Sequence, residues 1–162
     1  MQFQPIHALP FPLLAGFSDG RLCALEYTPD LPETYAPVTG ENYDVCRRLE
    51  AELAEYAAGK RKEFTIPLQP SGSDFSRLVW RELQKVPYGE VRSYGEIAAC
   101  ITAGSGRSSA LYSRAVGNAC GKNAILILIP CHRIIAKNGI GGFSCGLAVK
   151  KALWDIEGIR LP

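Results

Sequence analysis

Cys131 and His132 are neighbours in the sequence, and this pair is its strongest candidate for chemistry. A cysteine is a good nucleophile as its thiolate, and a free thiol has a pKa of about 8.5. A histidine in contact with the thiol can accept its proton. The sequence has 2 histidines, and one of them occupies this position. The pair predicts nucleophilic chemistry at sulfur, and the alternative is a core thiol beside a surface imidazole.

The residues before the pair predict how it is positioned. Residues 124–129 are all apolar and mostly Ile or Leu, which is typical of a strand buried on both faces. Pro130 has no N–H and a fixed φ, so it ends such a strand. We therefore expect Cys131 at the tip of a rigid strand, where the chain turns out of the core.

A longer pattern surrounds the pair. Residues 123–158 have the sequence NAILILIPCHRIIAKNGIGGFSCGLAVKKALWDIEG, and upstream lie PYGEV at 87–91, SY at 93–94 and SRAVG at 113–117. Together these motifs closely resemble the O6-alkylguanine-DNA alkyltransferases, also called methylated-DNA–protein-cysteine methyltransferases. The resemblance covers roughly residues 74–160, whereas the first seventy residues match the family only in layout. It implies single-turnover DNA repair, in which the alkyl group of O6-alkylguanine, and possibly of O4-alkylthymine, passes to Cys131 and inactivates the protein.

The resemblance also implies catalytic roles around the nucleophile. His132 would deprotonate Cys131 through a water, and Glu157 would hold the imidazole in the useful tautomer. Asn123 would brace the turns around the site. The plain alternatives are a solvated glutamate at a helix end and an asparagine that only makes a turn. With His132 and Glu157 behind it, we expect the pKa of Cys131 to lie below that of a free thiol.

Further roles concern DNA, because the target atom lies inside the base stack and the base must be flipped out. The resemblance implies that Arg114 fills the gap left in the duplex and that Tyr94 hydrogen-bonds the flipped guanine. Ser113, Ala115 and Gly117 lie beside Arg114 on the same predicted helix, and the small residues would let it approach the minor groove. The alternatives are a phosphate contact for Arg114 and plain helix packing for the small residues.

The implied substrate pocket uses mostly backbone groups. The carbonyls of Cys131 and Ile134 would accept from the exocyclic amine of guanine, and the N–H of Ser144 would donate to O6. Phe143 would form the wall together with Tyr94.

The sequence departs from the family pattern at three places. About six extra residues precede Arg114, with 103–106 as the expected bulge, and the loop near 140–141 is one residue shorter. Phe143 and Cys145 replace what are often Tyr and Gly. Whether Cys145 reacts is left open by the sequence.

The pattern predicts an α/β (α+β) fold with two domains. Residues 1–68 would form a small domain with a hairpin around Asp19-Gly20, one long helix ending near Gly59, and a strand at 64–68. By resemblance this domain is RNase H-like. Residues 69–73 form the expected linker.

Residues 74–162 would form a helical, winged helix-turn-helix domain. One helix is expected to begin near Ser73, and a capping box formed by Ser93 and Glu96 opens a second. A third helix, capped by Ser108 or Ser109, would run to about residue 119, and a last one would span 147–157. The wing would consist of the strand at 124–129 and the Gly-rich loop after it.

Charge supports a polyanionic partner. The net charge of +2 divides into −4 over residues 1–68 and +6 over residues 69–162, so the C-terminal half is suited to face nucleic acid. We expect alkylated double-stranded DNA as the partner, a monomer without metal or cofactor, and no membrane association. The expected location is the cytoplasm, or the nucleus in a eukaryote.

Two other function classes are compatible with parts of the pattern. A non-catalytic lesion binder or helix-turn-helix regulator could share the fold, but its known relatives replace the nucleophile that this chain keeps as Cys131. A cysteine hydrolase could use Cys131, His132 and Glu157, but the sequence has no evident oxyanion-hole motif.

Overall fold

The computed structural model describes residues 1–31 and 34–161. The chain divides into two compact units. Unit 1 comprises Met1–Ser71 and Ala124–Leu126, and unit 2 comprises Gly72–Asn123 and Ile127–Pro162. Residues 124–126, which the sequence assigned to the C-terminal domain, join unit 1 because Leu25 N donates to Ala124 O at 2.7 Å and Leu126 N donates to Leu25 O at 2.9 Å.

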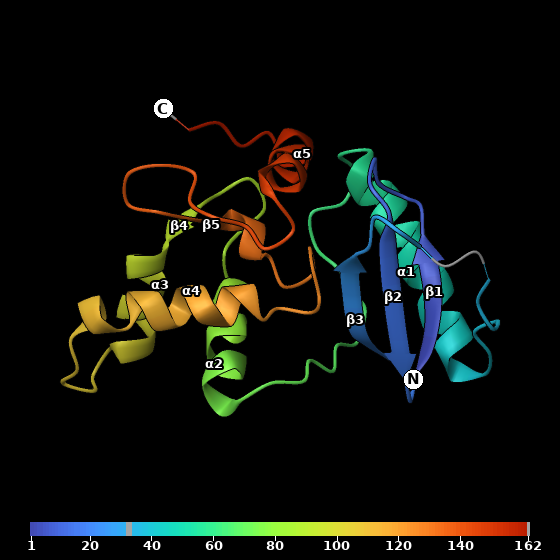
Figure 1. The fold of residues 1–162 in the computed structure, drawn as a ribbon, viewed down its shortest axis with the longest axis horizontal. Helices are drawn as coiled ribbons and strands as arrows, with labels where there is room; N and C mark the ends of the chain where they lie inside the picture. The colour runs from blue at the N-terminus through green and yellow to red at the C-terminus, as the bar shows by residue number, and fades with distance from the viewer. Residues whose placement is uncertain (32–33, 162) are drawn as a thin grey trace. The chain divides into compact units, whose positions relative to one another are not determined.

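Unit 1 contains a three-stranded antiparallel sheet in the order β1-β2-β3, with one helix packed on it (Figure 1). Its elements are β1 (Gln2–Ile6), β2 (Leu13–Ser18), β3 (Arg21–Tyr27) and α1 (Glu41–Ala57). The predicted hairpin is confirmed, since Asp19 and Gly20 form its turn with φ of 51° and 66°. β1 escaped prediction because its Gln and Pro residues give it no apolar alternation.

The core of unit 1 depends on the apolar face of α1. Leu49, Leu53 and Tyr56 recur at helical spacing, and none of the three exposes any surface. Just after the helix Gly59 adopts a φ of 70°, a conformation that glycine adopts most easily. The predicted helix and its end are therefore confirmed.

Two predicted strands are wrong. Residues 64–68 contain a single bridge, between Leu68 and Leu22 of β3. Residues 124–129 likewise contain one bridge, at Ile125, followed by a turn. The apolar run is buried as expected, but Ile127 has a φ of 72°, which is incompatible with a continuing strand. An unbroken apolar run indicates burial, and periodicity alone could not distinguish a strand from a buried turn.

Unit 2 is mainly helical, and α2, α3 and α4 pack against one another (Figure 1). Its helices are α2 (Asp74–Leu83), α3 (Tyr94–Thr102), α4 (Ser113–Gly121) and α5 (Leu147–Glu157). Ser73 caps α2 by accepting from Ser76 N, and the capping box that opens α3 is present. The predictions for α2, α3 and α5 are thus confirmed, although α3 extends to Thr102.

The predicted third helix is wrong at its start. A 3-10 turn, η1 (Ser109–Leu111), precedes α4, and Ser108 makes no capping hydrogen bond with its side chain. Tyr112 lies between the two elements and is the N-cap residue of α4, which begins at Ser113. The connection between α3 and α4 is therefore longer than the three to four residues of a tight helix-turn-helix.

A pair of short parallel strands positions the segment that follows Cys131. β4 (Arg92–Ser93) pairs with β5 (Ile134–Ile135), directly after a 3-10 turn, η2 (Cys131–Arg133). Because β4 leads straight into α3, this pairing holds the start of α3 near the residues that follow Cys131. None of the described helices combines the length and apolar character needed to cross a bilayer.

The N-terminal cap of α3 should contribute to the stability of the protein. Ser93 accepts from Glu96 N at 3.1 Å, and Glu96 Oε2 accepts from Ser93 N at 2.7 Å. Ser93→Ala should lower the free energy of unfolding by about 1 kcal/mol, measured by urea denaturation. Ser108→Ala is the matched control, because Ser108 is an N-cap without a side-chain hydrogen bond. Equal losses in both variants would contradict the role of the capping box.

Candidate active site and nucleic-acid groove

The nucleophile candidate lies in a buried turn rather than at a strand tip. The chain turns at Ile127 and reaches Cys131, the first residue of η2, which is 5% exposed. A β-branched residue with positive φ is strained, so the surrounding packing has to hold Ile127 there. The conformation of the backbone that leads to Cys131 therefore depends on the packing of the buried side chains around it.

Asn123 braces this turn, as the resemblance implied. Its Nδ2 donates to the carbonyl of Ile129 at 2.8 Å and to Sγ of Cys131 at 3.2 Å. One buried amide therefore contacts both the backbone of the turn and the sulfur. A hydrogen bond donated to sulfur favours the thiolate over the thiol.

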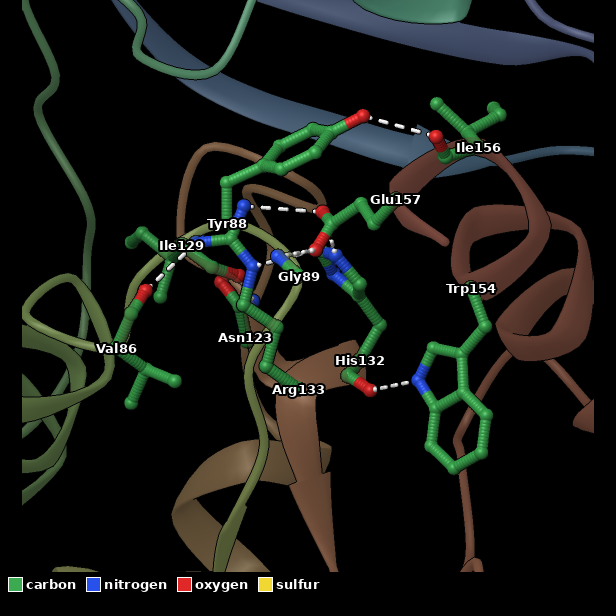
Figure 2. A network of polar contacts seen from close by, with 10 residues as sticks. All are labelled: Val86, Tyr88, Gly89, Asn123, Ile129, His132, Arg133, Trp154, Ile156 and Glu157. Atoms are coloured by element: carbon green, nitrogen blue, oxygen red, sulfur yellow. Dashed lines mark hydrogen bonds and ion pairs between the residues drawn. The ribbon is translucent and has the colours of Figure 1, made fainter. Parts of the chain in front are cut away.

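Glu157 lies between two cationic or potentially cationic side chains (Figure 2). Its Oε1 is 2.6 Å from Nε2 of His132 and accepts from Arg133 Nη2 at 2.9 Å. Its Oε2 accepts from Arg133 Nε at 2.9 Å and from Gly89 N at 3.1 Å. The guanidinium of Arg133 thus pairs with the carboxylate through two hydrogen bonds. Such a pairing determines the orientation of the carboxylate and also compensates its charge.

These contacts determine the ionisation of Glu157 and the tautomer of His132. Burial raises the pKa of Glu157, but the hydrogen bonds from His132 and Arg133 outweigh burial and hold that pKa well below its usual range. Burial lowers the pKa of His132 despite the carboxylate beside it. At neutral pH the pair is thus a carboxylate and a neutral imidazole, in which Nε2 carries the proton and donates a hydrogen bond to Glu157.

This tautomer leaves the other ring nitrogen of His132 as an acceptor. Nδ1 is buried and meets no hydrogen-bond partner among the described residues. A neutral imidazole with an unused, buried lone pair is equipped to accept a proton. Trp154 Nε1 donates to the carbonyl of His132 at 2.7 Å and fixes the backbone that carries the ring (Figure 2).

The expected depression of the thiol pKa is wrong. Burial raises the pKa of Cys131 to about 11, while the hydrogen bond from Asn123 opposes the shift. The carboxylate of Glu157 engages the histidine at Nε2, and the hydrogen bond that reaches the sulfur comes from the neutral amide of Asn123. The resting site therefore holds a protonated thiol, because desolvation of the thiolate exceeds the opposing effects of the Asn123 hydrogen bond and the Lys150 charge.

A small cavity opens at the sulfur. Its volume is about 220 Å³, and it is lined by Tyr94, Gly117, Cys120, Gly121, Cys131, Gly142, Phe143 and Ser144. Most of the predicted pocket residues are here. Ile134 is not, since its side chain is fully buried and its carbonyl accepts from Lys150 Nζ at 2.6 Å.

A larger open groove of about 830 Å³ lies alongside and shares Tyr94 and Gly117 with the cavity. It is lined by Ser93, Tyr94, Gly95, Glu96, Ala99, Ser113, Arg114, Gly117, Asn118, Ala136 and Lys137. Arg114 is exposed, as a residue that contacts DNA must be. Ala115 lies on α4 but does not line the groove.

Sequence reasoning missed two buried cations, Arg133 and Lys150. Arg133 is 6% exposed and also donates to Val86 O at 2.7 Å, while Lys150 is fully buried. A signal existed for Lys150, because it precedes Leu153 and Trp154 by three and four residues and so shares their core-facing side of α5. Within the described residues, no three His, Cys, Asp or Glu side chains are grouped to hold a metal ion.

Comparison with known proteins identifies this arrangement. The sequence profile described as "6-O-methylguanine DNA methyltransferase, DNA binding domain" matches residues 74–159. The methylated-DNA–protein-cysteine methyltransferase of Methanosarcina mazei is 36% identical over 159 residues, which is 97% of each chain. That of Methanosarcina acetivorans is 44% identical over 73% of this chain and 72% of its own.

The chain belongs to the 6-O-methylguanine DNA methyltransferase family. Its structure is similar to that of Mycobacterium tuberculosis OGT in complex with DNA, with a TM-score of 0.78 and 33% identity over 97% of this chain and 92% of that one. The mixed α/β architecture is the family's. The region matched to the methyltransferase profile includes every residue of the cavity and the groove.

Glu157 should be important for the stability of this methyltransferase. Glu157→Gln leaves Arg133 buried without its counter-charge, so the free energy of unfolding should fall by about 3 kcal/mol at pH 7, measured in urea. The carboxylate contributes fully above the unfolded-state pKa of about 4.3 and progressively less below it, because the folded-state pKa is depressed. The difference between wild type and variant should therefore narrow as pH falls below that value.

The control is Asp155→Asn on the same helix. Asp155 pairs with Arg160 at 3.2 Å, but both side chains are about 70% exposed, so little change is expected. A Glu157→Gln protein as stable as Asp155→Asn at pH 7 would contradict the central role of the carboxylate.

Proposed function

We propose that this protein repairs O6-alkylguanine in double-stranded DNA by transferring the alkyl group to Cys131 in a single turnover. It thus acts as a methylated-DNA–protein-cysteine methyltransferase. The observation that carries the proposal is the position of the Cys131 sulfur, in a cavity that shares Tyr94 and Gly117 with the groove along α3 and α4. A base flipped from DNA in that groove would place its O6 substituent near the sulfur.

The proton of the thiol goes to His132 in this mechanism. Nδ1 of His132 is the free acceptor, and a bridging water would carry the proton to it. The imidazolium that forms is stabilised by the Glu157 carboxylate at 2.6 Å. Because burial holds the pKa of Cys131 at about 11, the thiolate forms when the substrate is in place and the base removes its proton.

The transfer itself is a displacement at carbon. The sulfur of Cys131 attacks the alkyl carbon, the carbon–O6 bond breaks, and its electron pair stays on the guanine, which takes up a proton. Burial raises the pKa of Tyr94, so its hydroxyl remains a donor to the flipped base. The product thioether is a poor leaving group, and therefore each molecule reacts once.

The helices would bind DNA as a winged helix-turn-helix variant. In this arrangement α4 faces the minor groove, Arg114 fills the vacated stack, and Ser113, Ala115 and Gly117 allow close approach. Unit 1 would then be the RNase H-like domain. We further propose that the protein works as a monomer. We place it in the cytoplasm because its relatives named above are archaeal and bacterial.

Label transfer tests the nucleophile. With duplex DNA that carries a radiolabelled O6-methylguanine, wild type should gain one label per molecule, and peptide mapping should place it on Cys131. Cys131→Ala should lose transfer yet still bind the DNA, since the groove is unchanged. Label on Cys145 or elsewhere in the variant would refute the assignment.

Arg114 is tested by comparing two substrates. Arg114→Ala should slow repair of duplex DNA at least tenfold while leaving the reaction with free O6-benzylguanine nearly unchanged, because only the duplex needs a flipped base held out. Arg81→Ala, at an exposed position of α2, is the control. Equal losses on the two substrates would mean that Arg114 does not fill the gap left in the duplex and contributes only a general electrostatic attraction to DNA.

A further inference from the structure

Leu111 is the most exposed of the large apolar side chains in the part of the chain that the structure describes, with a relative exposure of 79%. It is the last residue of η1, in the connection between α3 and α4. A single exposed leucine is ordinary on a protein surface and needs no function. This leucine differs in how firmly it is held, in what lies beside it and in the charge of its surroundings.

The turn that carries Leu111 is braced by its neighbours. Leu111 N donates to Ser108 O at 3.2 Å, and η1 packs against α3. The ring of the next residue, Tyr112, packs against the ring of Phe75 on α2, with the centroids 6.2 Å apart. The hydroxyl of Tyr112 also accepts from Arg107 Nη1 at 2.9 Å. Leu111 therefore projects from a turn that neighbouring elements hold in place.

Leu111 lies three residues before Arg114. Tyr112, which comes between them, has a helical φ of −95° and ψ of −13° and is the N-cap residue of α4. Residues three apart in helical backbone are neighbours on one face, so the leucine and the exposed arginine share a face at the start of α4. Ser113 and Arg114 line the open groove. Leu111 thus adds an apolar group at the edge of the proposed DNA-binding surface.

The charge of the segment around Leu111 favours a polyanion. Between Glu96 and Asp155 the sequence contains no Asp or Glu. The exposed cations before and after Leu111 are Arg107 and Arg114. Duplex DNA matches both features, because its phosphates attract the cations and its base steps accept an apolar side chain from the minor groove.

We propose that Leu111 is an apolar wedge for DNA: when Arg114 occupies the place of the flipped base, Leu111 enters the minor groove and inserts at the adjacent base step. This inference rests on the proposed binding of DNA along α4 and adds a residue that acts on the step beside the lesion. Apolar wedges of this kind partly unstack a base step and bend the duplex toward the major groove. The damaged base is then easier to extrude, because it has lost stacking on that side.

Repair rates test the wedge with three variants. Leu111→Ala shortens the side chain, Leu111→Gln makes it polar at similar size, and Leu111→Met keeps it apolar. The second-order rate constant for repair of O6-methylguanine in duplex DNA should fall about tenfold in the Ala and Gln variants and stay within about twofold of wild type in the Met variant. The reaction with free O6-benzylguanine should be unchanged in all three, since it involves no base step. Tyr43→Ala, which removes an exposed aromatic side chain from α1, is the control and should match wild type on both substrates.

The fluorescence of 2-aminopurine tests insertion without alkyl transfer. This base analogue brightens when it is unstacked, and it is placed in turn on each side of an O6-methylguanine in duplex DNA. When the Cys131→Ala protein binds, one of the two flanking positions should brighten. Adding Leu111→Ala should abolish that rise, whereas adding Leu111→Met should preserve it. Leu111→Ala should leave the salt dependence of DNA affinity unchanged, because it removes no charge.

Three results would overturn the proposal. Equal losses of rate on duplex DNA and on free O6-benzylguanine would mean that Leu111 supports the fold of the site. Wild-type repair and unchanged 2-aminopurine fluorescence in Leu111→Ala would leave the wedge without a function. Self-association of wild type that Leu111→Ala abolishes, measured by analytical ultracentrifugation with repair unaffected, would assign the leucine to a contact with a second copy of the chain. If wild type takes up no label, the transfer to Cys131 fails, whereas the fluorescence experiment still tests insertion.

Discussion

The buried carboxylate of Glu157 is the interaction on which the site depends. It accepts from Gly89 in the turn before β4, from Arg133 in η2, and from His132, whose ring it orients. Three segments distant in sequence thereby meet at one group (Figure 2). A carboxylate is costly to bury, but here each oxygen has at least two donors, and Arg133 compensates the charge. Burial keeps the imidazole neutral, and its contact with Glu157 through Nε2 leaves Nδ1 available.

Desolvation is the second constraint, and it acts on the nucleophile. Burial holds the Cys131 thiol protonated, so the resting protein does not present a reactive thiolate. Asn123 and Lys150 oppose that effect, the first by a hydrogen bond to the sulfur and the second by charge. In the proposed single-turnover reaction, a thiol that ionised only with its substrate in place would be protected from side reactions that waste the protein.

Local signals in the sequence predicted much of the frame. Ser93 and Glu96 placed the start of α3 because a capping box is satisfied within four residues. The spacing of Leu49, Leu53 and Tyr56 predicted α1 for the same reason, since a helix face is determined by near neighbours. The prediction of a strand at 124–129 was wrong because an unbroken apolar run has no periodicity that distinguishes a strand from a buried turn. The positive φ of Ile127 depends on the packing around it.

The sequence by itself determined which atoms can react: a thiol next to an imidazole, with an asparagine eight residues before them and a glutamate near the end of the last helix, in a pattern close to a known family. Only the tertiary structure decided how those atoms behave. The raised pKa of Cys131, the tautomer of His132 and the buried contacts of Arg133 and Lys150 arise from burial and from contacts such as that of Gly89 with Glu157, 68 residues apart. Desolvation and long-range hydrogen bonding exist only once the chain has folded, because they depend on what each group has lost from water and met in its place.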